Sequence, residues 1–295
     1  MESILERLHR GDVIVGDGAI GTELMKRGLR QGDPPESYNL LKPEALEEVA
    51  ALYLASGAEI VTTNTFGASP LRLRQFCLEK DTEAINRLAV EAVRRAVAHK
   101  AYVSGSVGPS ALSLRPFGDT EPEEISASFE RQIRALVSAG VDMICIETMT
   151  CTTEAVLAVR AARAVSPEIP VMATLTFRKS PQGFSAATGD SVRAAAEALL
   201  LAGADIVGSN CGNGMEDMVS IAREFRAWAR APIAIQANAG LPVVAESELV
   251  YPETPEFMAA RSAELLEIGV QIIGGCCGTG PEHIRSLRRA VDARR

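Results

Sequence analysis

Three cysteines stand out among the residues that could do chemistry: Cys211 in the stretch GSNCGNG, and the adjacent pair Cys276 and Cys277 in GGCCGTG. A catalytic zinc ion commonly takes three protein ligands and keeps one position open. Three thiolates would form an electron-rich site that suits a further sulfur ligand better than water, and a thiol bound to zinc ionises at neutral pH. The three residues therefore indicate a site that could bind and activate a thiol.

Other interpretations of the same residues remain open. The pattern also fits a buried or redox-active cysteine pair, or a glycine loop that binds pyrophosphate. Neighbouring side chains of a regular strand point to opposite faces, so Cys276 and Cys277 can bind one ion only if the strand ends before them. The glycines on both sides of the pair permit such a departure from the strand.

A pattern that recurs four times predicts the elements that position these cysteines. A helix-like segment ends at a glycine, and a short apolar run follows, which is typical of a strand buried on both faces. The copies begin at Ser56, Ala139, Ala202 and Ile268, and four further strand candidates begin at Asp12, Ala101, Pro170 and Pro232. Helical segments separate them at Glu44–Ser56, Thr82–His99, Glu123–Ser138, Glu154–Val165, Ser191–Leu201, Glu216–Trp228, Pro255–Glu267 and Pro281–Val291.

Eight strands that alternate with eight helices predict an α/β fold, a single (β/α)8 TIM barrel, with an open doubly wound sheet as the main rival. No linker-like segment divides residues 1–295, so we expect one domain. The active-site face of a barrel lies at the carboxyl ends of its strands. Positions seven and eight residues after each capping glycine fall there, and they hold Asn64, Glu147, Asn210 and Cys276, then Thr65, Thr148, Cys211 and Cys277.

Composition narrows the class of protein. The chain has 295 residues, 47% of them hydrophobic, and a net charge of −8. This charge argues against a nucleic-acid partner, which needs a basic surface. No apolar run reaches the ~18 residues of a membrane span, and the first residues lack a signal-peptide pattern. We therefore expect a cytoplasmic protein without a membrane partner, whose six cysteines stay reduced.

The motifs around the cysteines resemble those of the homocysteine S-methyltransferase family, which includes the homocysteine module of cobalamin-dependent methionine synthase and betaine–homocysteine methyltransferase. The motifs are GSNCGNG and IIGGCCGTGPEHI, and agreement in the same order comes from DGAIGTEL, GDPPESYNLLKPE, TNTFGAS, SVGPS, ETM and NAGLP. The resemblance runs from residue 12 to about residue 290. It implies a (β/α)8 barrel, in agreement with the pattern of elements, and methyl transfer to homocysteine.

The resemblance also implies a ligand set for zinc. Cys211, Cys276 and Cys277 would bind the ion, and the homocysteine sulfur would be the fourth ligand. Asn238 in NAGLP would fill the fourth position through its side-chain oxygen when substrate is absent. A neutral oxygen ligand should yield readily to a thiolate on this metal. Without the resemblance, Asn238 would be interpreted as an ordinary turn residue.

Substrate-binding residues follow in the same way. Asp17 and Glu147 match acidic residues that face the amino-acid end of homocysteine, where a carboxylate is a natural partner of the ammonium group. Gly18, Thr63 and Asn64 are expected to shape the pocket or to offer backbone groups to the substrate carboxylate.

The methyl donor is not fixed by the motifs. We favour methylcobalamin held by a separate corrinoid protein or domain, with S-methylmethionine or S-adenosylmethionine as the alternative. Betaine is disfavoured, because aromatic residues make up only 4% of the chain and GDPPESYNLLKPE lacks tryptophan, although Tyr38 and Phe66 could contact it. A barrel that only binds zinc and a thiol, without catalysis, is the alternative from a different class.

Overall fold

The computed structural model describes residues 1–115, 118–181, 183–245 and 248–294. Eight parallel strands lie in the order β1-β12-β9-β8-β5-β4-β3-β2, and a parallel bridge between Gly16 and Ile60 brings β1 next to β2. The strands are β1 Ile14–Val15, β2 Ile60–Thr62, β3 Tyr102–Val107, β4 Met143–Met149, β5 Val171–Leu175, β8 Ile206–Asn210, β9 Ile233–Ala237 and β12 Ile272–Gly275. The predicted (β/α)8 barrel is confirmed.

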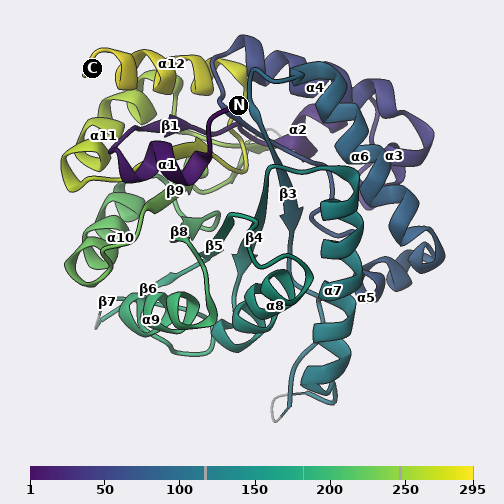
Figure 1. Cartoon of the computed structure of the whole chain (residues 1–295). Helices are drawn as coiled ribbons and strands as arrows, with labels where there is room; N and C mark the ends of the chain where they lie inside the picture. The colour runs from purple at the N-terminus through teal and green to yellow at the C-terminus, as the bar shows by residue number, and fades with distance from the viewer. Residues whose placement is uncertain (116–117, 182, 246–247, 295) are drawn as a thin grey trace.

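The eight predicted helices form an outer ring around these strands (Figure 1). They are α4 Pro43–Ala55, α6 Thr82–Val97, α7 Pro122–Ala139, α8 Thr152–Val165, α9 Val192–Ala202, α10 Met215–Trp228, α11 Pro255–Ile268 and α12 Pro281–Asp292. Three of the recurring glycines, Gly140, Gly203 and Gly269, are the C-caps of α7, α9 and α11, with φ of 91°, 109° and 88°. Only glycine adopts this conformation without strain, so these residues end the helices where each next strand must begin.

Several shorter elements were not predicted. They are α1 Ile4–His9, α2 Ile20–Met25, α3 Ser37–Leu41, α5 Pro70–Leu73, the 3-10 turns η1 Arg74–Phe76 and η2 Glu79–Asp81, and the antiparallel pairs β6 Arg178–Ser180 with β7 Gly183–Ser185 and β10 Val243–Ala245 with β11 Glu248–Val250. Helix α1 closes the amino-terminal end of the barrel. Its buried Ile4 and Leu8 pack with Ile14, Tyr102 and Met143 from the strands. The carboxyl end is thereby left as the mouth.

The strands are continuous hydrophobic runs in the sequence because both of their faces are buried. Strands β3, β5, β8 and β9 are buried at every position, because helices cover their outer faces and side chains fill the barrel interior. Among the described residues, no helix combines the length and apolar character that crossing a bilayer requires.

Gly208 in β8 is a position where the packing tolerates no side chain. A Cβ atom there would lie 1.8 Å from the carbonyl oxygen of Ala234 in the neighbouring strand β9. Gly208→Ala should therefore lower the free energy of unfolding by about 3 kcal/mol, the upper range for overpacking, because backbone must move. Urea denaturation monitored by circular dichroism would measure the change. Gly21→Ala, where a Cβ would meet nothing within 4 Å, is the matched control.

Candidate metal and substrate site

The three cysteines converge at the mouth of the barrel. Cys211 follows β8, and Cys276 and Cys277 follow β12. Their three Sγ atoms all lie within 4.8 Å of one another, and those of Cys211 and Cys277 are 3.7 Å apart. Tetrahedral zinc with Zn–S bonds of about 2.3 Å places its sulfur ligands roughly 3.8 Å apart. The spacing of the thiols therefore fits a single metal ion.

Backbone hydrogen bonds to β9 and the loop after it fix these thiols. The N–H groups of Cys211 and Cys276 donate to the carbonyl oxygens of Gln236 and Ala237, at 3.1 and 2.8 Å. The N–H of Ala239 donates to the carbonyl oxygen of Cys277 at 3.0 Å. Strand β12 ends at Gly275, directly before the cysteine pair, so the condition under which both can face one ion is met.

Cys211 adopts a left-handed backbone conformation with φ of 59°. A residue with a side chain rarely holds this conformation unless its surroundings impose it, and such strain is concentrated at functional sites. The N–H bond to β9 and the following Gly212, with φ of 72°, impose it here. The turn after β8 thereby places the Cys211 sulfur beside that of Cys277.

Hydrogen bonding within the cluster shifts the pKa values of Cys276 and Cys277 in opposite directions. Hydrogen bonds from Cys211 and Cys276 lower the pKa of the Cys277 thiol to about 3, and the hydroxyl of Tyr251 also donates to it. The same hydrogen bonding, together with burial, raises the pKa of the Cys276 thiol well above its usual range. Hydrogen bonding among the three thiols thus favours a thiolate within the cluster, and the thiolate is the form that binds a metal.

Asn238 offers a further test of the metal fit. Its side-chain oxygen Oδ1 is buried and has no hydrogen-bond partner among the described residues. Buried polar atoms nearly always have a hydrogen-bond partner. The unpaired amide oxygen of Asn238 is therefore available to bind a ligand such as a metal ion. Asn238 directly precedes Ala239, which binds Cys277. The three thiols form a donor set that zinc accepts, and Asn238 stays a predicted fourth ligand.

A cavity of about 650 Å³ opens above the thiols. All but one of the nine predicted site residues line it, and the exception is the buried Asn238. The residues that do so are Asp17, Gly18, Thr63, Asn64, Glu147, Cys211, Cys276 and Cys277. The strand ends that carry these residues therefore meet at one mouth of the barrel, as predicted.

Asp17 and Glu147 are the two predicted site residues with carboxyl groups in this cavity, and Asp33 and Glu36 line it as well. The Asp17 carboxylate accepts hydrogen bonds from the Thr62 N–H and hydroxyl, at 2.6 and 3.0 Å, and burial raises its pKa to about 7. The Glu147 carboxylate accepts from the Ser106 hydroxyl at 2.5 Å, and burial raises its pKa as well. A cation that enters the cavity would favour the charged form of both groups.

Gly18, Thr63 and Asn64 shape the walls. A Cβ atom at Gly18 would lie 2.9 Å from the carbonyl oxygen of Thr279, so the loop after β1 approaches the cysteine loop closely only because this residue is glycine. The Thr63 hydroxyl pairs with that of Thr65 at 2.7 Å, and the Asn64 amide donates to the Pro35 carbonyl oxygen at 2.7 Å. The side chains of Thr63 and Asn64 thus hold neighbouring loops in place.

Other residues of the cavity were not predicted to bind metal or substrate. Ser106, Gln236 and Tyr251 line it, and so does Thr148, whose amide is bound by the side chain of Asn210. The register of seven and eight residues after each capping glycine already contained Thr148 and Asn210, so that signal could have found them. Tyr251 follows the β10–β11 pair, and no periodic pattern in the sequence predicts that pair.

The remaining candidates lie elsewhere. His283 caps α12, because its Nδ1 accepts from the Gly280 N–H. Tyr38 is buried beside Lys42, outside the cavity lining, which removes it from the possible contacts to betaine. Cys145 is buried at the opposite end of the barrel.

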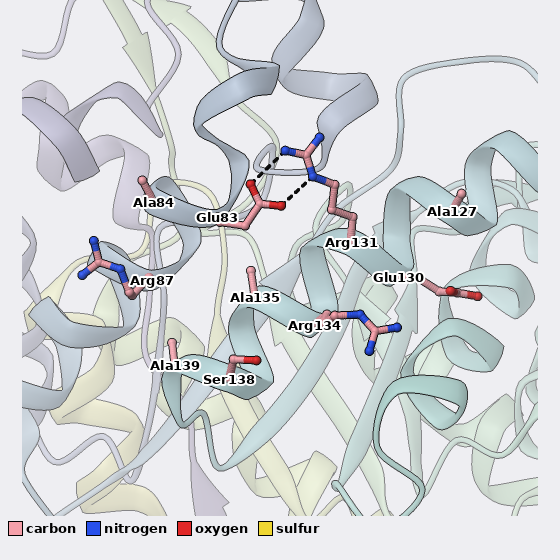
Figure 2. Close-up of a pocket in the computed structure, with 10 residues that line it drawn as sticks. All are labelled: Glu83, Ala84, Arg87, Ala127, Glu130, Arg131, Arg134, Ala135, Ser138 and Ala139. Atoms are coloured by element: carbon pink, nitrogen blue, oxygen red, sulfur yellow. Dashed lines mark hydrogen bonds and ion pairs between the residues drawn. The ribbon is translucent and has the colours of Figure 1, made fainter.

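A second hollow, of about 690 Å³, lies on the outer wall between α6 and α7 (Figure 2). Alanines and charged side chains line it, and Arg131 pairs with Glu83 across it at 2.6 Å. It is open to solvent and brings together no thiols or carboxyl clusters of the kind at the mouth. The chemistry therefore belongs to the cavity above the cysteines.

Comparison with known proteins agrees with this site. The model of the homocysteine S-methyltransferase family matches residues 14–291, so the chain belongs to that family of methyltransferases. The methionine synthases of Mycobacterium leprae and Mycobacterium tuberculosis are 31% and 32% identical to it over 95% of its length. The chain spans about a quarter of the length of these relatives, 24% in both cases.

Solved structures show the same fold. The oxidized form of the homocysteine methyltransferase MmuM from Escherichia coli is 25% identical, with a TM-score of 0.79 and 98% of both chains covered. The metallated form of the same protein has a TM-score of 0.81 at 24% identity, covering 96% of this chain and 98% of that one.

Proposed function

We propose that residues 1–295 form one homocysteine-binding barrel domain, and that it is a zinc-dependent methyltransferase that converts homocysteine to methionine. The observation that carries this proposal is the cluster of Cys211, Cys276 and Cys277, whose sulfurs lie within 4.8 Å of one another in the lining of the cavity that Glu147 shares. Membership of the homocysteine S-methyltransferase family supports the acceptor.

The residues of the cavity have distinct parts in this reaction. Cys211, Cys276 and Cys277 would hold the zinc ion, with Asn238 as an exchangeable fourth ligand. Bound zinc lowers the pKa of a coordinated thiol, so that the thiolate exists at neutral pH. Glu147, with Asp17 deeper in the wall, would bind the ammonium group of homocysteine.

The methyl transfer itself is an in-line nucleophilic displacement. The homocysteine thiolate attacks the methyl carbon, a sulfur–carbon bond forms, and the bond from the methyl group to the donor breaks, with its electron pair leaving on the donor. The thioether of methionine is a weak ligand and no longer carries charge, so the product can leave. No general base beyond the activated thiol is required.

Methylcobalamin bound to another protein, or to another part of a longer chain, is the donor that we favour. The resemblance of the motifs to the homocysteine module of cobalamin-dependent methionine synthase supports it, and two methionine synthases are 31% and 32% identical over 95% of this chain. S-methylmethionine or S-adenosylmethionine is the alternative, and neither donor would require a corrinoid partner. We further propose a reducing compartment, the cytoplasm, because the thiols must stay reduced to hold a metal.

A donor panel tests the proposal. Purified protein with zinc and homocysteine should form methionine from methylcobalamin faster than from S-methylmethionine or S-adenosylmethionine, as measured by mass spectrometry. Removal of zinc with a chelator should abolish the reaction, and added zinc should restore it, because the thiolate form of the substrate is lost with the metal. Homocysteine binding without methionine from any donor would instead indicate a barrel that only binds zinc and a thiol.

A further inference from the structure

Asn210, the last residue of β8, connects the thiol cluster with the carboxylate of the cavity. Its Nδ2 donates to Glu147 Oε2 at 3.2 Å and to Thr148 Oγ1 at 2.8 Å, and it lies 3.9 Å from the Cys276 sulfur. Its Oδ1 accepts from the Thr148 N–H at 2.7 Å and from the Thr174 hydroxyl at 2.8 Å. Only 1% of the residue is exposed, so these contacts are shielded from water.

The partners of Asn210 determine which way its amide points. A backbone N–H can only donate, so the atom that faces the Thr148 N–H is the oxygen. The NH₂ group must then face Glu147 and Cys276, and a carboxylate oxygen and a cysteine sulfur can both accept a hydrogen bond. An aspartate in place of Asn210 could still accept from the Thr148 N–H, but it could not donate to Glu147 and Cys276.

The backbone beside Glu147 needs support. Thr148 has φ of 58°, a left-handed conformation that is unfavourable for a β-branched residue, and the pairing of β4 with β5 shifts register between Ile146 and Met149. The Asn210 side chain binds both the N–H and the hydroxyl of Thr148. It therefore holds the irregular end of β4 in the position from which Glu147 reaches the cavity.

We propose that Asn210 is a positioning residue that fixes the Glu147 carboxylate relative to the Cys276 sulfur. This inference rests on the proposed function: one homocysteine molecule must reach the metal with its sulfur and Glu147 with its ammonium group at the same time. Groups that orient metal ligands and substrate-binding residues act through such hydrogen bonds, and their loss reduces metal affinity or activity by about 10–100-fold.

The variant Asn210→Asp separates the two ends of the side chain. It keeps an acceptor for the Thr148 N–H and the Thr174 hydroxyl, but it replaces the donor toward Glu147 and Cys276 with a negatively charged oxygen. We expect the KM for homocysteine to rise by about 10–100-fold, with a smaller change in kcat. With cobalt in place of zinc, we expect the thiolate-to-cobalt absorption bands to differ from those of the unaltered protein, before and after homocysteine is added.

Asn86→Asp is the matched control. Asn86 is as fully buried, and its Nδ2 also donates to two oxygens, the carbonyls of Ala68 and Thr82, none of which belongs to the cavity lining. This variant should be less stable, but its KM for homocysteine and its cobalt bands should not change. If Asn210→Asp does not fold, the double variant N210D/T148G is measured instead, because glycine adopts the left-handed conformation of residue 148 freely.

The outcomes are separable. A homocysteine KM within about twofold of the unaltered protein, together with unchanged cobalt bands, would overturn the role of Asn210. If the unaltered protein makes no methionine, the proposed function fails, and the bands of the cobalt protein without homocysteine then decide: a shift in Asn210→Asp supports its contact to Cys276, and identical bands refute it.

Discussion

Cys276→Ala should give a folded barrel that no longer retains zinc and forms methionine more than about 100-fold more slowly, a loss beyond that of an outer-shell partner. The sulfur of Cys276 is one of only three in the cluster, and two remaining thiolates leave two positions of a tetrahedral ion to weak ligands. The fold should survive because Cys276 lies after the end of β12 and belongs to neither large core cluster.

Metal analysis and far-UV circular dichroism on the same sample measure this prediction. Cys145→Ala is the control, since it also removes one sulfur, but from the buried cluster at the closed end of the barrel. It should lower stability through the cavity that it leaves, while zinc content and methionine formation stay unchanged. A full complement of zinc in Cys276→Ala would exclude this residue as a ligand, and unfolding would indicate a structural metal instead.

The barrel could be predicted because its signals are local and repeated. Gly140, Gly203 and Gly269 end helices through a conformation that other residues avoid, and each precedes a strand buried on both faces. Once the barrel is assumed, the fixed distance from cap to strand end brings Glu147 and Cys276 to the same face. Short elements such as α1 carry too few residues for a periodic signal, and tertiary packing decides their structure.

The contacts between site residues could not be predicted in the same way. The register placed Asn210 at a strand end, but only the structure gives its hydrogen bonds to Thr148 and Glu147. The unpaired oxygen of Asn238 is likewise a property of the packed environment, since an asparagine before Ala-Gly is otherwise typical of a turn. Spacing along a chain fixes which strand end a residue occupies, whereas partners depend on loops from other strands.

The outer part of the cavity favours a second, less polar reactant. Met25, Phe66 and Phe76 line it, and each is more than a third exposed. A volume of about 650 Å³ lies in the range of pockets that hold drug-sized ligands, well above the need of a small amino acid. Trp228, the chain's one tryptophan, stacks on Arg193 and is not part of this lining, so no tryptophan contributes to an aromatic cage for betaine.

Glu147→Gln should raise the KM for homocysteine by about 10–150-fold, which corresponds to the 1.5–3 kcal/mol of a hydrogen bond to a charged group. The amide keeps the shape of the side chain and can still accept from Asn210, but it no longer offers a negative charge to the substrate ammonium group. Zinc content should not change, because Glu147 is not part of the thiol cluster proposed to hold the ion. Steady-state kinetics at saturating methyl donor would measure the KM.

Glu154→Gln provides the comparison that isolates the charge at Glu147. Glu154, in the first turn of α8, is also buried, binds a serine hydroxyl, that of Ser110, at 2.6 Å, and has a pKa raised by burial. It does not line the cavity, so the KM for homocysteine should stay within about twofold. Equal effects of the two substitutions would mean that Glu147 supports the wall of the barrel mouth as Glu154 does, and that the ammonium group of homocysteine binds elsewhere.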